Sequence, residues 1–184
     1  MCRLFAWHST KPLSVTSVLG PDLQDFTELS TLHRDGWGIA YGDADEIKLV
    51  RDTSPAHESK IYSDMLTQMQ ATNAIAHLRW ATEELAVCIP NTHPFVKKSE
   101  MGEIAFIHNG GVTRGDSLTA LIGADFLNQL EGETDSEQYF AALLTQLRKS
   151  GGDILAAYQA LVIDFAPIHY TSLNAMILTE TELV

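Results

Sequence analysis

Apolar and polar positions follow two periods along the chain, and the two periods separate helices from strands. Residues 58–70 are helical in pattern, because Ile61, Met65, Leu66 and Met69 share one face of a helix. The same spacing predicts further helices in the second half of 14–32 and over 116–130, 135–152 and 153–167, the last of which could run into a strand.

Strands are predicted where alternating or short apolar runs are rich in β-branched and aromatic residues. The segment GWGIAYGDADEIKLVRD, residues 36–52, has two such runs around a turn rich in Gly and Asp, which is typical of a hairpin. Residues 88–95, CIPNTHPF, are predicted to form a proline-punctuated loop. Other strands are predicted over 3–7, 73–82, 103–111 and 173–184, the last as a strand, a turn and the beginning of another strand.

The order of these elements mixes strands and helices and favours an α+β fold with largely antiparallel sheet. The last predicted strand stops at Val184, where a hairpin partner is expected to continue. We therefore expect residues 1–184 to form a single domain that lacks C-terminal strands of the full domain.

The composition suits one globular domain with a real core, because 45% of the 184 residues are hydrophobic. The formal net charge of −12 repels phosphate groups and makes nucleic acid and anionic membrane poor partners. No apolar stretch reaches the length of a membrane span, and no signal peptide is visible. Two cysteines do not make a disulfide framework, so we expect a cytoplasmic protein.

Cys2 follows directly behind the initiator methionine in MCRLF. It is either a small buried residue at the start of a strand or, once Met1 is removed, a nucleophile beside its own free α-amine. An α-amine has a pKa of about 7.7–8.0 and can act as the base for a neighbouring thiol at neutral pH. If a chain that retains Met1 showed near-normal turnover, His77 or His108 would become the better candidate base. Cys88, in a loop without an evident base, is expected to be structural or incidental.

Arg79 lies in HLRWATEE, at the end of a predicted strand. An arginine on a strand usually faces solvent or a neighbouring carboxylate, and this interpretation stays open. The functional alternative is that its guanidinium holds a ligand carboxylate through two parallel hydrogen bonds. Trp80 and Thr82 would then wall and hydrogen-bond the same ligand.

The segment FIHNGGV contains Asn109 and Gly110, a pair that is typical of a tight hairpin turn. A second interpretation is compatible with the first. The side-chain amide of Asn109 and the backbone N–H of Gly110 would form an oxyanion hole for a thiol that attacks an amide. Gly110 has no Cβ to obstruct the substrate.

The segment ETDSEQYF begins a predicted helix, with Thr134 as N-cap and Glu137 at the N3 position. Asp135 would then only complement the helix dipole. The functional alternative is that Asp135 pairs with the ammonium group of a substrate. The local sequence supports both alternatives equally.

A metal site made from His33, His77, His93 and His108 is disfavoured, because the i, i+4 helical spacing is missing and no carboxylate cluster accompanies them. We expect no metal and no other cofactor. The glycines of HRDGWGIAY and the proline of NTHPF indicate close backbone approach and a fixed loop.

Six motifs occur in a characteristic order: MCRLF, HRDGWGIAY, HLRWAT, NTHPF, FIHNG and TDSE. In that order they resemble the class II glutamine amidotransferases, which are N-terminal nucleophile hydrolases. The likeness runs from Cys2 to the final predicted strand and is strongest to a stand-alone branch related to enzymes that cleave γ-glutamyl amides. It implies a four-layer αββα sandwich of two antiparallel sheets.

The resemblance also implies a role for each matching residue. Cys2, freed of Met1, would attack the side-chain amide of glutamine or a related γ-glutamyl compound, and Asn109 and Gly110 would form the oxyanion hole. The substrate-binding roles would fall on Arg79 for the α-carboxylate, Asp135 for the α-ammonium, and Trp80 and Thr82 for the pocket walls.

One position departs from the family pattern. The chain has RWATEE where many members carry RWATHG, so Glu83 replaces a pocket histidine and leaves the contact near Thr82 open. Larger members add a synthase domain that accepts ammonia, for which 184 residues leave no room. We expect a small-molecule substrate, with a synthase partner or a homo-oligomer left open. The competing hypothesis is a non-catalytic binding module, or an unprocessed precursor, of the same fold.

Overall fold

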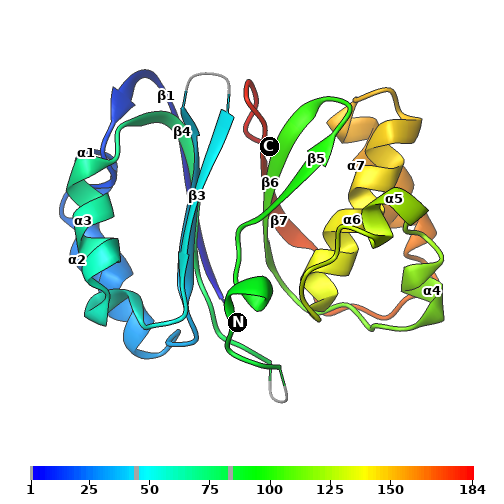
Figure 1. Ribbon diagram of the computed structural model, residues 1–184, viewed down its shortest axis with the longest axis horizontal. Helices are drawn as coiled ribbons and strands as arrows, with labels where there is room; N and C mark the ends of the chain where they lie inside the picture. Colours follow the sequence, from blue (N-terminus) through cyan, green and yellow to red (C-terminus); the bar gives the residue numbers. More distant parts are fainter. Residues whose placement is uncertain (1, 44–45, 83–84) are drawn as a thin grey trace.

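The computed structural model describes residues 2–43, 46–82 and 85–184. Two antiparallel sheets face each other, and a layer of helices covers the outer face of each sheet (Figure 1). The four-layer αββα sandwich that the resemblance implies is confirmed. Within the described ranges, none of the helices has both the length and the apolar character that crossing a bilayer requires.

The first sheet has the strand order β1-β4-β2-β3, with antiparallel neighbours throughout. Its strands are β1 (Arg3–Leu13), β2 (Trp37–Asp43), β3 (Glu46–Asp52) and β4 (Ala71–Leu78). In the β1–β4 pair, Arg3 lies opposite Leu78. The residues just outside this pair, Cys2 and Arg79, therefore emerge at the same end of the sheet.

The second sheet has the order β5-β6-β7. Its strands are β5 (Phe95–Ser99), β6 (Gly102–Asn109) and β7 (Asn174–Leu178). The predicted strand, turn and beginning of another strand over 173–184 are confirmed, because an isolated bridge joins Leu178 to Leu183 and Val184 exchanges two backbone hydrogen bonds with Ile177, at 2.8 and 2.9 Å.

The helices fall into two groups, one on each sheet (Figure 1). The first sheet carries α1 (Val15–Leu19), α2 (Asp22–Glu28) and α3 (Lys60–Gln68), with the short 3₁₀ helices η1 (Leu29–Thr31) and η2 (Ala56–Glu58). The second carries α4 (Asp116–Thr119), α5 (Ala124–Leu127), α6 (Asp135–Lys149) and α7 (Ile154–Asp164). A third 3₁₀ turn, η3 (Ile89–Asn91), belongs to the segment that connects the sheets.

The core consists of three apolar clusters, one for each contact between layers. The cluster under α6 and α7 contains Phe106 and Phe140, whose rings stack at 4.8 Å between centroids. The cluster under α1 to α3 is built around Trp37, which is fully buried. The cluster between the sheets consists of small and aliphatic residues: Ala40, Ile47, Ile75, Ala105, Ile107 and Leu178.

The prediction of a single helix over 116–130 is wrong, because two short helices, α4 and α5, form there instead. Gly123 separates α4 from α5 and has an extended backbone, with φ −63° and ψ 146°. Its N–H donates a hydrogen bond to the hydroxyl oxygen of Thr145 on α6, at 2.9 Å. A tertiary hydrogen bond to α6 therefore replaces the helical bond that the apolar spacing predicts.

Candidate active site

Cys2 lies against the ends of two strands. Its backbone N–H donates to Oδ1 of Asn109 at 3.1 Å, and its Sγ accepts from the backbone N–H of Trp80 at 3.4 Å. Burial raises the pKa of the Cys2 thiol, and the hydrogen bond from Trp80 lowers it. Cys2 is half-buried, so the thiol is not sealed in the core as a small apolar residue would be.

Arg79 is buried, with only 3% of its surface exposed, so the interpretation as a solvated strand residue is wrong. Its backbone N–H donates to Gly36 O at 2.8 Å. Its guanidinium donates to the carbonyls of Asp35 and Ala86, at 3.3 and 3.4 Å. Burial lowers the pKa of this guanidinium, and the charge of Asp35 raises it.

The predicted hairpin turn at Asn109 and Gly110 is wrong. The chain continues from β6 to Val112, which bridges Tyr170, and neither Gly110 nor Gly111 has a positive φ. A Cβ on Gly110 would lie 2.0 Å from Ser172 O, so the glycine is needed for close backbone packing. The Asn109 oxygen is bonded to Cys2, which leaves the NH₂ end of that amide as a donor.

Asp135 has a structural partner as well as a place in the pocket. Thr134 caps α6 by accepting from Glu137 N at 3.1 Å, as predicted. The Asp135 carboxylate accepts from the backbone N–H of Val112 at 2.6 Å. It thereby ties the start of α6 to the segment that follows β6, where Asn109 and Gly110 lie.

Two adjoining pockets contain all seven of the predicted catalytic and substrate-binding residues. The inner pocket, of about 40 Å³, is lined by Arg79 and Asp135, and the outer one, of about 460 Å³, by Asn109. The residues common to both pockets include Cys2, Trp80, Thr82 and Gly110. Glu83, the departure from the family pattern, lies outside the described residues.

The ring nitrogens of the histidines near the pocket are either hydrogen-bonded or buried. His108 donates from Nε2 to Ser172 O at 3.0 Å, which leaves Nδ1 to accept from the Ser136 hydroxyl at 2.9 Å. His77 donates to His108 O at 3.2 Å, and burial lowers the pKa of His77 to about 3. Within the described ranges, no three His, Cys, Asp or Glu side chains converge as metal ligands.

Sequence reasoning missed Asp35, whose carboxylate accepts from Ala81 N at 2.7 Å and holds the backbone beside Trp80. The available signal is its place in HRDGWG, whose glycines are predicted to allow close backbone approach. That prediction is confirmed. Gly36 has φ +115°, and a Cβ on Gly38 would lie 2.2 Å from His93 O of the NTHPF motif.

Solved structures with this architecture define the class of fold. A glutamine aminotransferase class-II domain protein from Silicibacter pomeroyi superposes with a TM-score of 0.65 and 22% identity, over 100% of this chain and 74% of that one. The glutamine phosphoribosylpyrophosphate amidotransferase of B. subtilis superposes with a TM-score of 0.60 and 18% identity, over 100% of this chain and 36% of that one. The chain has the N-terminal nucleophile hydrolase fold.

Sequence comparison then gives the family. The family model for class-II glutamine amidotransferases matches residues 1–170. A Haemophilus influenzae protein named "Putative glutamine amidotransferase" is 30% identical over 152 residues, which is 82% of this chain and 49% of that protein. The chain belongs to the class II glutamine amidotransferase family. It spans less than half the length of the curated relatives that it matches.

Proposed function

We propose that Cys2, once Met1 is removed, is the nucleophile of an amidohydrolase that cleaves the side-chain amide of glutamine or a related γ-glutamyl compound. The observation that carries this proposal is the 3.1 Å bond from Cys2 N to Asn109 Oδ1. It brings the nucleophile, the nitrogen that becomes its base and a candidate oxyanion donor to one point.

The proposed reaction has two halves. In the first, the α-amine takes the thiol proton, Sγ bonds to the amide carbon, and the carbonyl oxygen is held by Asn109 Nδ2 and Gly110 N–H. The C–N bond then breaks, and the proton leaves with the ammonia or amine. In the second half, water attacks the γ-glutamyl thioester, and glutamate and the free thiol are formed.

The α-amine is favoured as the base over His77 and His108, which both use ring nitrogens in hydrogen bonds. Both His108 nitrogens are hydrogen-bonded, and His77 uses Nε2 for a carbonyl. The nitrogen of Cys2 belongs to the same residue as the thiol. Removal of Met1 turns this nitrogen from an amide, which is not basic, into an amine.

Recognition of the substrate is assigned to the inner pocket. Arg79 would hold the α-carboxylate and Asp135 the α-ammonium. Trp80 and Thr82 would form the walls of the pocket. The inner pocket shares Cys2, Trp80 and Thr82 with the larger outer pocket, so a substrate held by Arg79 and Asp135 would keep its side-chain amide beside the thiol.

The proposed site does not select the leaving group or the acceptor, because glutamine and other γ-glutamyl compounds share the half that carries the α-carboxylate and the α-ammonium. We propose that residues 1–184 form one glutamine-hydrolysing domain. It acts either on a free γ-glutamyl compound or as the glutaminase part of a complex or a homo-oligomer. Arg79 and Asp135 contact only the half that all these substrates have in common.

The proposal is tested by glutamate release from glutamine and γ-glutamyl amides, after intact mass has shown that Met1 is absent. We expect Cys2→Ala to abolish release. Cys88→Ala should keep activity within about a factor of two, as is usual for a residue outside the site. Equal losses from the two variants would contradict the assignment, and a folded, processed chain that releases no glutamate would favour a binding module.

A further inference from the structure

Asn91 is buried in the pocket wall, with 1% of its surface exposed, yet its amide is used entirely on backbone groups. Nδ2 donates to Ala86 O at 3.1 Å, and Oδ1 accepts from Glu133 N at 2.8 Å. An amide is the side chain that offers a donor and an acceptor at such a junction. Asn91 therefore joins two chain segments that lie far apart in the sequence.

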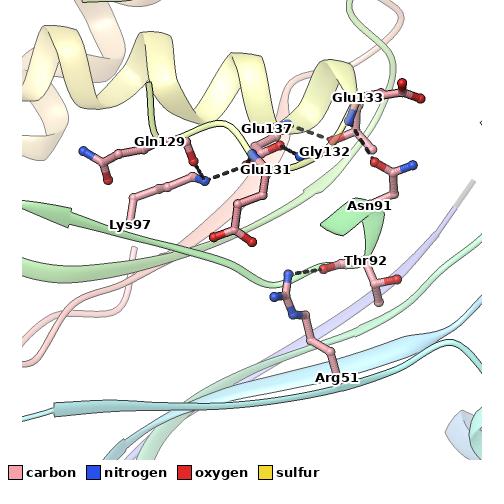
Figure 2. Close-up of polar contacts among 10 residues, drawn as sticks. Arg51, Asn91, Thr92, Lys97, Gln129, Glu131, Gly132, Glu133 and Glu137 are labelled. Carbon is pink, nitrogen blue, oxygen red and sulfur yellow. Dashed lines mark hydrogen bonds and ion pairs between the residues drawn. The ribbon is translucent and has the colours of Figure 1, made fainter. Parts of the chain in front are cut away.

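The first of these segments contains Ala86, which also contacts Arg79. The Ala86 carbonyl that accepts from Asn91 also accepts from the Arg79 guanidinium, at 3.4 Å. The turn that carries Asn91 is fixed to the first sheet by Arg51, which donates to Thr92 O at 3.0 Å (Figure 2). The amide of Asn91 is thus tied to the group proposed to hold the substrate carboxylate.

The other segment leads into Asp135. Glu133 comes two residues before it, and the neighbouring Gly132 packs on the Asn91 turn so closely that a Cβ would lie 2.5 Å from Asn91 Oδ1. The carboxylate of Glu137, on α6, accepts from Glu131 N and Gly132 N at 2.9 and 2.8 Å (Figure 2). Those two bonds hold residues 131–132 to α6. The bond from Glu133 N to Asn91 instead connects the same loop to the segment that contacts Arg79.

We propose that Asn91 is a positioning residue that sets the separation between the Arg79 guanidinium and the Asp135 carboxylate. The inference rests on the proposed function. Glutamine carries its α-carboxylate and α-ammonium on one carbon atom, so it can reach both groups only at one separation. A ligand that lacks the ammonium group uses Arg79 alone and is insensitive to that separation.

The test measures binding by calorimetry in the Cys2→Ala background, where no turnover occurs. The ligands are glutamine and glutaramate, which is glutamine without its α-amino group. Asn91→Ala is compared with Asn73→Ala, which removes another buried asparagine that accepts a backbone N–H, from Gly42 at 3.1 Å, at the far end of β4. Asn91→Asp, which keeps the acceptor and loses the donor, is the second variant if Asn91→Ala does not fold.

We expect the Asn91 variants to bind glutamine at least about tenfold more weakly. A change in the separation of Arg79 and Asp135 misaligns one of the two contacts that glutamine makes with them. Glutaramate affinity should change by less than about threefold, and Asn73→Ala should change neither affinity. If glutaramate binding is too weak to measure, the glutamine comparison between the Asn91 and Asn73 variants decides.

Three results would overturn the inference: equal losses for the two ligands, equal losses from the two asparagines, or no binding of glutamine to the Cys2→Ala chain. Failure of the proposed reaction gives a different result. Glutamine would then bind, the Asn91 effect would be present, and the processed wild-type chain would release no glutamate.

Discussion

At the scale of single residues, Arg79 is the most informative side chain. A buried guanidinium is costly unless it is hydrogen-bonded and paired. Its side-chain donors reach two carbonyls at 3.3 and 3.4 Å, and among the described residues no carboxylate forms an ion pair with it. A substrate carboxylate would supply the missing anion in a pocket that Arg79 already lines.

Arg79→Lys keeps the charge and loses the planar fork that holds a carboxylate with two bonds. We expect kcat/KM for glutamine to fall by the equivalent of about 2–4 kcal/mol, the range for truncating a buried charge partner. Arg34→Lys, at an exposed position next to Asp35 in the sequence, is the matched control and should leave kcat/KM unchanged. Activity of Arg79→Lys within a factor of about two of wild type would show that this residue does not bind the substrate.

The sequence identifies residues whose chemical type is unusual for their position, and it fails for residues that act through the backbone. Cys2, Arg79 and Asp135 carry reactive or charged groups inside motifs, so they could be predicted. The roles of Asp35 and Asn91 could not, although both lie inside motifs, because their side chains bind the N–H and C=O groups of Ala81, Ala86 and Glu133. Such partners are defined only once the chain has folded.

At the scale of elements, the end of β6 carries the proposed oxyanion hole. It is held by the segment 170–172, because Val112 bridges Tyr170, Gly111 N donates to the Thr171 hydroxyl at 2.9 Å and His108 bonds Ser172 O. The shape of the hole therefore depends on how closely these two backbone segments approach each other.

Gly110→Ala is expected to lose most activity, because its Cβ would lie 2.0 Å from Ser172 O and would push the segments apart. We expect a loss of stability of about 1–3 kcal/mol, as for other overpacked sites. Gly111→Ala is the matched control, since its Cβ would meet Thr171 Oγ1 at an ordinary 3.4 Å. Thermal unfolding and glutamate release check both variants, and equal behaviour of the two would contradict this account of Gly110.

Elements with one clear period could be predicted, and elements that depend on distant partners could not. The antiparallel pair β2–β3 and the helices α3, α6 and α7 follow from their patterns. Strand β5 was missed because FVKKS contains two lysines. One of them, Lys97, is buried and pairs with Glu137 at 2.5 Å (Figure 2). Its carboxylate partner lies 40 residues away, so the local pattern resembles an exposed surface.

At the scale of the whole molecule, the two sheets bring the site together. The β1–β4 pair places Cys2 beside Arg79 and Trp80, and the facing sheet supplies Asn109 from the end of β6. The order of motifs indicated which residues belong together. The strand order β1-β4-β2-β3, which explains why they meet, depends on pairings between distant segments that no local pattern contains.

The central claim is that Cys2 acts with its own α-amine. The most direct measurement compares glutamate release by the processed chain with release by a chain that retains one residue before Cys2, both verified by intact mass. The extension converts the amine to an amide and leaves every histidine in place. We predict a loss of at least about a hundredfold, the low end for removing a general base. Near-normal turnover by the extended chain would contradict the claim.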